Sequence, residues 1–253
     1  MNLKSPLFNY DANSNSVVSP TEDPEFTGFA KCLFAFVEDK DLQNFFEDYD
    51  VEQVFQFENI TKQFPIWRLT IENEAIMVAQ APLGAPAAVQ FLDYLIGHGA
   101  KQIISLGSCG VLTKRPEAAF LVPFTALRDE GTSYHYLPAA PTIELNETMQ
   151  TTIERQINRT GRTTSRVKTW TTDAFFRETQ ALIEEYRAAG YETVEMECAA
   201  LAACAEFRQV AFGQFFFTAD SLADSNNYDK RGWGLSARQE ALQMGLAILL
   251  HLE

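Results

Sequence analysis

Apolar and polar positions alternate in blocks along this chain, and the blocks predict strands that take turns with helices. Short apolar runs indicate buried strands, whereas apolar residues that recur every three or four positions indicate helices. One helix has Pro86 in its first turn and is closed by Gly97 and Gly99, as the preferences of these residues suggest. The predicted strands are 67–71, 75–79, 103–106, 120–124, 166–170, 193–196 and 210–218, and the predicted helices are 26–49, 86–96, 143–158, 178–189, 198–207 and 235–250.

This alternation favours an α/β fold, in which helices cover both faces of a sheet. We expect a single layered domain over residues 1–253, because no repeat or low-complexity linker divides the chain. Residues 1–24 are polar and rich in turn formers. They predict an N-terminal arm with at most one short strand, around Val17 and Val18.

Composition narrows the choice of partners. The chain has 253 residues, of which 46% are hydrophobic, and a formal charge of −14. That charge argues against binding to nucleic acids or anionic membranes, which need basic patches. No apolar run reaches the roughly 18–20 residues of a membrane helix, and no signal peptide is recognised at the start. With four cysteines and no CxxC pair, we expect a cytoplasmic protein with free thiols.

The segment Gly107-Ser108-Cys109-Gly110 follows the predicted strand 103–106. Its glycines would let a backbone approach a ligand, and successive amides in a turn form an anion-binding nest. An ordinary strand-to-loop turn has the same appearance, so this pattern alone is weak.

The segment Val194-Glu195-Met196-Glu197 lies between a predicted strand and an alanine-rich helix. Alternation sends Glu195 and Glu197 to the same side of an extended segment. A carboxylate there would accept hydrogen bonds from a vicinal diol such as that of ribose, and Met196 offers a compliant apolar surface. The helix dipole explains one acid at a helix start, but two less well.

Two further segments carry candidate chemistry. Asp220 ends an apolar strand, where it is either a turn residue or a proton donor that is costly to bury unused. Phe175 and Phe176 stand in a polar loop, where one of them could stack on a planar ring. No metal-binding cluster and no serine-hydrolase elbow is present in the sequence, so no metal or organic cofactor is expected.

Taken together, these segments resemble the nucleoside phosphorylase family, in the branch of the purine and uridine phosphorylases and the nucleosidases. The resemblance covers roughly residues 66–250 and rests on motifs that occur in the family's order, while residues 128–138 are most similar to a uridine-phosphorylase-like subgroup. The motifs are Pro82-Leu-Gly-Ala-Pro86, Leu106-Gly-Ser-Cys-Gly110, Thr172-Asp-Ala-Phe-Phe176, Val194-Glu-Met-Glu197 and Ala219-Asp220.

The resemblance implies a single three-layer domain with a mixed, partly closed β-sheet flanked by helices. It also implies a homo-oligomer (a dimer, a trimer of dimers or a hexamer) in which a neighbouring subunit completes each site. Glu197 would bind the ribose 2′- and 3′-hydroxyls, with Met196 under the sugar and Glu195 beside it. The other implied roles are base binding by Phe175, Asp220 and Arg177, catalytic protonation of the leaving base by Asp220, and phosphate binding at Ser105, Gly107 and Ser108.

Three departures from the family pattern concern the nucleophile and the base. Residues 17–24 lack the glycine and arginine of the family's N-terminal phosphate loop, Ser105 replaces an arginine, and Ala219 replaces a serine. Guanidinium groups bind phosphate through charged hydrogen bonds worth roughly 1.5–3 kcal/mol each. Their loss weakens a phosphate site unless Arg68, Arg128 or another subunit supplies a cation.

Three functions therefore compete. The leading hypothesis is phosphorolysis of a nucleoside to the free base and ribose 1-phosphate. The second keeps the site but uses water, with Glu22 and Glu130 as candidates to activate it. The third is a nucleoside-binding protein without turnover.

Overall fold

The fold was analysed in a computed structural model that describes residues 5–21 and 25–252. Its strands are β1 (Lys31–Ala35), β2 (Asp50–Glu58), β3 (Gln63–Ile71), β4 (Glu74–Gln80), β5 (Gln102–Val111), β6 (Phe120–Asp129), β7 (Thr142–Glu144), β8 (Thr164–Thr172), β9 (Tyr191–Glu195) and β10 (Ala211–Ser221). Its helices are α1 (Asp39–Phe46), α2 (Ala85–Gly97), α3 (Ser133–Tyr136), α4 (Glu147–Arg159), α5 (Gln180–Ala188), α6 (Cys198–Phe207) and α7 (Arg238–Leu250), with short 3-10 helices η1 (Pro6–Phe8), η2 (Phe175–Arg177) and η3 (Leu235–Ala237).

The sheet is mixed and partly closed, as predicted. Strands β5, β10, β6, β8 and β9 pair in that order, and β9 returns to β5, so these strands form a closed ring. Strands β1, β4, β3 and β2 extend the sheet outward from β5. Strand β5 therefore belongs to both the ring and the open part of the sheet.

Strand β5 changes its neighbour within the segment that the sequence singled out. Its pairing with β1 ends at Leu106, and its pairing with β9 begins at Gly110. Along the described chain, residues 107–109 thus have no strand partner on that side. Such a change of partner is where ligands bind in open α/β sheets.

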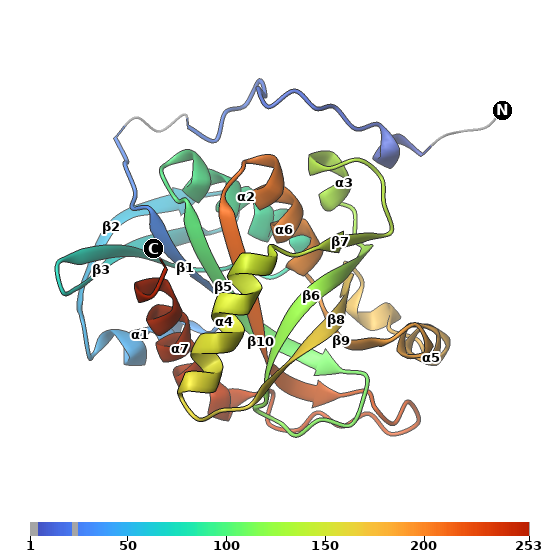
Figure 1. The fold of residues 1–253 in the computed structure, drawn as a ribbon. Coiled ribbons are helices and arrows are strands. Elements are labelled where there is room, and N and C mark those ends of the chain that lie inside the picture. Colours follow the sequence, from blue (N-terminus) through green and yellow to red (C-terminus); the bar gives the residue numbers. More distant parts are fainter. Residues whose placement is uncertain (1–4, 22–24, 253) are drawn as a thin grey trace.

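Helices cover both faces of this sheet (Figure 1). Helices α2 and α6 pack on one face, in a cluster with Phe34, Ile103 and Phe216. Helices α1, α4 and α7 pack on the other face, against Leu33 and Phe217. Helix α5 packs on β9, and its Ile183 lies in one apolar cluster with Tyr191 and the buried Trp170.

Two sequence predictions about local structure are wrong. Residues 26–49 do not form one helix, because residues 31–35 form the central strand β1 and α1 begins at Asp39. A central strand is buried on both faces, so its apolar run also satisfies helical spacing. The predicted turn at 107–110 is also absent, because β5 continues through it to Val111.

Gly107 has a packing role in addition to the ligand approach that was predicted. A Cβ atom on Gly107 would lie 3.1 Å from the Cβ of Phe36, so this glycine allows close packing within a strand. The N-terminal arm, predicted to hold at most one short strand, has none around Val17 and Val18, and both side chains are exposed. The half-exposed strand β2 escaped prediction because its apolar positions do not alternate regularly.

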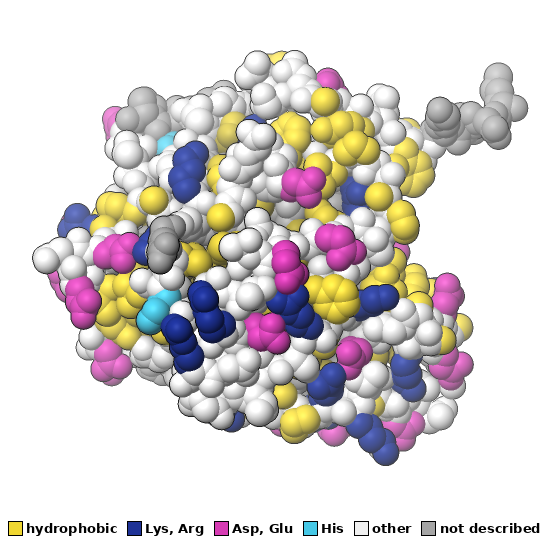
Figure 2. Space-filling model, viewed as in Figure 1, with side chains coloured by type: hydrophobic (Ala, Val, Ile, Leu, Met, Phe, Trp, Pro, Cys, Tyr) yellow, Lys and Arg dark blue, Asp and Glu magenta, His cyan; other side chains and the backbone are white. Residues whose placement is uncertain are grey.

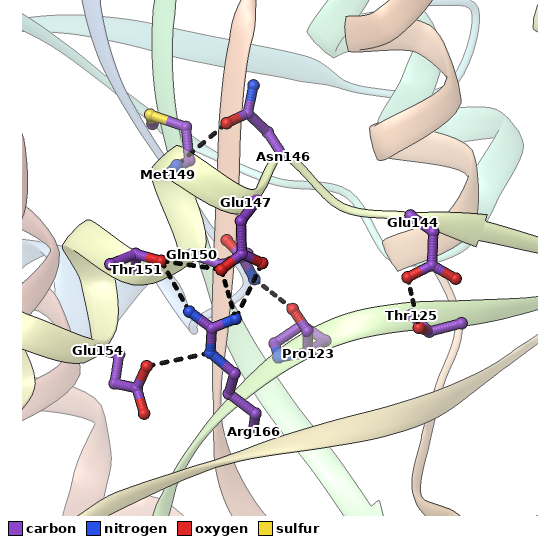
Figure 3. Close-up of polar contacts among 10 residues, drawn as sticks. All are labelled: Pro123, Thr125, Glu144, Asn146, Glu147, Met149, Gln150, Thr151, Glu154 and Arg166. Atoms are coloured by element: carbon purple, nitrogen blue, oxygen red, sulfur yellow. Dashed lines mark hydrogen bonds and ion pairs between the residues drawn. The ribbon is translucent and has the colours of Figure 1, made fainter.

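Helix α4 fixes the course of β10, which carries Asp220 at its end. Gln150 donates through Nε2 to the carbonyl group of Pro123 (Figure 3). It also donates to the carbonyl group of Gln214 and accepts from the Gln214 amide at 3.2 Å. Nearby, Arg166 of β8 contacts Glu147 at 2.7 Å and Glu154 at 3.0 Å. These contacts tie α4 to β6, β8 and β10.

The same helix approaches β10 most closely at Gly213. A Cβ atom there would lie 2.6 Å from the Cδ1 of Ile153 and 3.1 Å from the Cβ of Met149. We expect Gly213→Ala to lower the free energy of unfolding by about 1–3 kcal/mol, because overpacking strains the core. Urea denaturation measures this change. Gly131→Ala is the control, since its Cβ would meet its nearest atom at 3.7 Å, and an equal loss in both variants would contradict the explanation.

The surface carries both signs of charge. On the face shown in Figure 2, Lys and Arg side chains lie among Asp and Glu side chains. This face thus offers a nucleic acid no continuous basic surface. Among the described residues, no helix is long and apolar enough to span a bilayer.

Candidate active site

A cavity of about 780 Å³ opens at the ends of β5, β9 and β10. It lies where β5 changes partner, and the loop with η2 forms one wall. The structure brings together almost all of the predicted site residues. Those that line the cavity are Gly107, Ser108, Phe175, Arg177, Glu195, Met196, Glu197 and Asp220.

Glu195 ends β9 and ties it to the start of α6. One of its oxygens accepts hydrogen bonds from the hydroxyl of Thr171 at 2.6 Å and from that of Thr169 at 3.3 Å. The other accepts from the amides of Glu197 at 2.8 Å and Cys198 at 2.6 Å. Burial raises the pKa of Glu195 to about 7 against these donors. Because both oxygens are occupied, this carboxylate positions the segment that carries Glu197.

Glu197 caps the same helix, and its side chain turns into the cavity. Its Oε1 accepts a hydrogen bond of 2.6 Å from the Gly84 amide. Gly84 has a φ of +92°, which favours glycine and explains its place in the Pro82–Pro86 motif. Burial, and then the neighbouring Glu195 charge, raise the pKa of Glu197 to about 8. A buried carboxyl group with little protein hydrogen bonding is suited to a ligand that brings donors of its own.

The two serines of β5 lie differently. Ser108 is exposed within the cavity, beside the part of β5 that lacks a strand partner. Ser105 is fully buried, and its hydroxyl has no hydrogen-bond partner in the described chain. It is not among the residues that line the cavity. The neighbouring Gln214 of β10, paired with Ser105 in register, does line it.

Asp220 lies near the end of β10, where its Oδ1 is 3.3 Å from the place that a Cβ atom on Gly110 would occupy. Burial raises its pKa, while a hydrogen bond from the Tyr228 hydroxyl and the charge of Arg231 oppose the rise. Glu178, which follows η2, also faces the cavity. Burial and the repulsion of Asp220 raise the pKa of Glu178 to about 7. Glu178 and Asp220 are therefore two carboxyl groups of raised pKa that line the same cavity.

Apolar side chains form the mouth of the cavity. Phe175 and Phe176 pack edge to face with ring centres 5.1 Å apart. Phe176 is 94% exposed, so Phe175 is the better placed of the two for stacking on a bound ring. Leu83 and Trp233 complete the mouth.

The cavity is rich in carboxyl groups. Asp173, Glu178, Glu195, Glu197 and Asp220 line it, whereas Arg177 is the basic residue that does so among the described residues. Where these carboxyl groups are ionised, they disfavour an anionic ligand and stabilise a developing cation. This effect grows as the pH rises, because burial raises the pKa of Glu178 and Glu195 to about 7 and that of Glu197 to about 8.

The other cations and acids considered from the sequence lie elsewhere. Arg68 pairs with Glu52 on β3 and β2, and Arg128 is held by Ser133 and two carbonyl groups. Glu130 accepts the Ser133 amide at 2.9 Å and does not line the cavity. Glu22 lies outside the described residues.

Sequence reasoning missed Glu178, Gln214 and Trp233 as cavity residues. Glu178 directly follows Arg177 at the end of the aromatic loop, so the sequence could have indicated it as a further polar residue of the site. Gln214 and Trp233 come from the interior of an apolar strand and from a long loop, where the sequence alone indicates no ligand.

Comparison with known proteins agrees with this architecture. A family model described as the phosphorylase superfamily matches residues 34–249, so the likeness begins earlier than the motifs indicated. No curated protein sequence matches the chain significantly.

Several solved structures share the fold. Uridine phosphorylase from Vibrio fischeri ES114 superposes with a TM-score of 0.77 at 18% identity, over 93% of this chain and 95% of that one. Purine nucleoside phosphorylase from Toxoplasma gondii superposes with a TM-score of 0.74 at 16% identity, over 88% of this chain and 90% of that one. AMP nucleosidase from Bacteroides thetaiotaomicron VPI-5482 superposes with a TM-score of 0.70 at 21% identity, over 90% of this chain and 93% of that one. The fold and the family model together show that the chain belongs to the phosphorylase superfamily, among the nucleoside phosphorylases and nucleosidases.

Proposed function

We propose that this chain cleaves the N-glycosidic bond of an uncharged nucleoside and releases the free base. The observation that carries the proposal is Glu197, a buried carboxyl group that lines the cavity and accepts from the backbone of Gly84 and Met196 but from no side chain in the described part of the chain. Ribose 2′- and 3′-hydroxyls would donate to it. Met196 would lie against the sugar, and Phe175 would stack near the base.

Asp220 supplies the proton for departure of the base. As the bond between C1′ and the base nitrogen breaks, its electron pair goes to the base, and a carboxyl group with a raised pKa can protonate it. The sugar becomes oxocarbenium-like. The ionised carboxylates nearby stabilise that positive charge, and an oxygen nucleophile then bonds to C1′. When the nucleophile is water, its proton passes to solvent.

Water is the nucleophile that the scarcity of cations in the cavity favours. A phosphate dianion would enter among five carboxyl groups, with Arg177 as the one cation lining the cavity in the described part of the chain. The same scarcity of cations disfavours a nucleotide as substrate. This proposal thus differs from the phosphorolysis that the family resemblance implies.

Phosphorolysis is the second candidate, because Ser108 and the unpaired stretch of β5 face the cavity. That function requires cations besides Arg177 to reach the cavity, such as those of a neighbouring subunit. The homo-oligomer itself stays a prediction, which fits the exposed Leu83 and Phe176 at the mouth.

Release of free base from a panel of nucleosides, with and without inorganic phosphate, tests these assignments. We expect release in phosphate-free buffer and about the same rate when phosphate is added. A strict requirement for phosphate would reject water and establish phosphorolysis. Binding without release of base from any nucleoside would reject both and leave a nucleoside-binding protein.

A further inference from the structure

The aromatic wall of the cavity, residues 174–177, is held at its ends rather than by the core. Its helix η2 has three residues, and none of them is buried. Phe175 packs edge to face on Phe176, which is itself almost fully exposed. Apolar packing thus gives this wall little support, so its position depends on the contacts of the residues that lead into it.

Asp173 makes such a contact directly before the wall. Its Oδ2 accepts a hydrogen bond of 2.8 Å from the amide of Gly131, which belongs to the loop between β6 and α3. The amide of Ala174 donates to the hydroxyl of Thr172 at 3.2 Å. A carboxylate that accepts from a backbone amide forms a strong hydrogen bond. Asp173 therefore ties the start of the wall to the loop of another strand.

The N-terminal arm packs next to the same loop. A Cβ atom on Gly131 would lie 3.7 Å from the Oδ2 of Asp173 and 3.8 Å from the Cδ1 of Leu7. Phe8 of η1 packs edge to face on Tyr134 of α3, with ring centres 5.3 Å apart. Figure 1 shows the arm passing beside α3. Gly131 thus lies next to both the arm and the residue that leads into the wall.

The loop around Gly131 is firmly held. The indole of Trp170 donates to Asp129 at 2.9 Å. Tyr134 donates its hydroxyl to the carbonyl group of Arg128 at 2.9 Å, and its ring centre lies 4.2 Å from the guanidinium carbon of Arg128. A loop with such support can serve as the fixed point for a binding wall that has no core of its own.

Open space lies on two sides of Asp173. The residue lines the active-site cavity, and it also lines a second cavity of about 770 Å³ that residues of the arm and of α2 border. Few packed atoms therefore limit the movement of the wall, and the hydrogen bond to Gly131 has a correspondingly large part in its position.

We propose that Asp173 is a positioning residue, which fixes the aromatic wall through Gly131, and that η1 of the arm supports this contact. The inference rests on the proposed function and deepens it, because the wall is the part of the cavity that would stack on the base. Asp173 acts through Phe175. Loss of its hydrogen bond leaves Glu197 and Asp220 in place, so binding of the base weakens while the chemical step is kept.

Binding of a free base tests this inference independently of turnover. Calorimetry with adenine and with uracil is compared for Asp173→Ala and Asp173→Asn, which lose the same charge. The asparagine oxygen can still accept from the amide of Gly131, so the difference between the two variants isolates the hydrogen bond. We expect Asp173→Ala to bind the preferred base at least about threefold more weakly than Asp173→Asn, the range for one hydrogen bond.

The part of the arm is tested in the same way. Phe8→Ala removes the ring that packs on Tyr134, and it should weaken base binding about threefold. Val17→Ala is the control on the arm, because this side chain is fully exposed, and Glu185→Gln on the exposed side of α5 is the control for an acid changed to an amide. Both should bind the base like the wild-type protein.

Turnover separates positioning from a general loss of structure. For the best nucleoside, kcat should be the same for Asp173→Ala and Asp173→Asn, while KM is at least about threefold higher for Asp173→Ala. Equal base binding by these two variants, a lower kcat for Asp173→Ala, or no binding of either base to the wild-type protein would overturn the inference. Equal binding by Phe8→Ala and Val17→Ala would reject the part of the arm. The expected binding without release of base from nucleosides would reject the proposed function and leave this inference standing.

Discussion

Replacing Glu197 by glutamine is expected to remove most nucleoside cleavage while leaving the fold at least as stable as before. Glutamine keeps an oxygen for the Gly84 amide, which donates to Glu197 at 2.6 Å. It cannot ionise, so it offers the two ribose hydroxyls no charged acceptor. At roughly 1.5–3 kcal/mol for each hydrogen bond to a charged group, the expected fall in kcat/KM is about 10²- to 10⁴-fold.

Stability should change in the opposite direction, and the change should depend on pH. The pKa of Glu197 is raised from 4.5 to about 8 in the folded protein, so the folded state holds this proton more tightly than the unfolded chain. The protonated group contributes fully to the free energy of unfolding below pH 4.5, and this contribution is lost as the pH rises toward 8. Glu197→Gln cannot ionise, so its advantage in the free energy of unfolding should grow over that interval.

Two measurements check this prediction: kcat/KM for the best nucleoside of the panel, and urea denaturation at several pH values between 4.5 and 8. Glu185→Gln serves again as the control, since Glu185 is exposed. A Glu197→Gln protein that turned over nucleosides normally would rule out the proposed ribose site.

The sequence predicted the layers of this fold because its amphipathic and buried segments are mostly long. Helix α6, with alanine and cysteine buried all round, and β10 were predicted almost as the structure has them. β1 was mistaken for helix because a strand buried on both faces has no alternation to reveal it. The closure of the sheet could be predicted only from the family resemblance. Strand order is set by contacts between residues far apart in the sequence, which local patterns do not reveal.

The site was predictable where short motifs occur at strand ends. Glu197 and Asp220 were identified in this way, and both line the cavity. Ser105 was assigned to phosphate by its position relative to Gly107 and Ser108. Because β5 continues as a strand through these residues, Ser105 lies below the cavity, while Ser108 faces it. The role of Glu195 in positioning was also hidden, because its partners Thr169 and Thr171 belong to another strand.

Glu195→Gln should have the opposite effect on stability to Glu197→Gln, although the two residues are separated by a single methionine. Both carboxylate oxygens of Glu195 are acceptors, one for hydroxyl groups and the other for the amides of Glu197 and Cys198. Glutamine must turn its NH₂ group toward one of these sets of donors. A buried donor facing donors costs about 1–3 kcal/mol for each group left unpaired.

We therefore expect Glu195→Gln to lower the free energy of unfolding by about 2–5 kcal/mol, the range for breaking a buried polar network. Burial raises the pKa of Glu195 to about 7, so ionisation of this group lowers the free energy of unfolding of the wild-type protein. Glu195→Gln avoids that cost. Its loss of stability relative to the wild-type protein should therefore be larger below pH 7 than above it. Activity should fall with stability, because the amide of Glu197 is one of the groups released. Urea denaturation and kcat/KM measure the two effects.

Thr169→Val is the matched control for this network. It removes the longest of the four hydrogen bonds, at 3.3 Å, and keeps the shape of a fully buried side chain. We expect it to cost less than about 1.5 kcal/mol, the upper end for an ordinary hydrogen bond. If Glu195→Gln were as stable and as active as the control, the amides of α6 would not depend on this carboxylate. If Glu195→Gln were instead as stable as the control but much less active, Glu195 would act directly on the ligand, as the family resemblance implies.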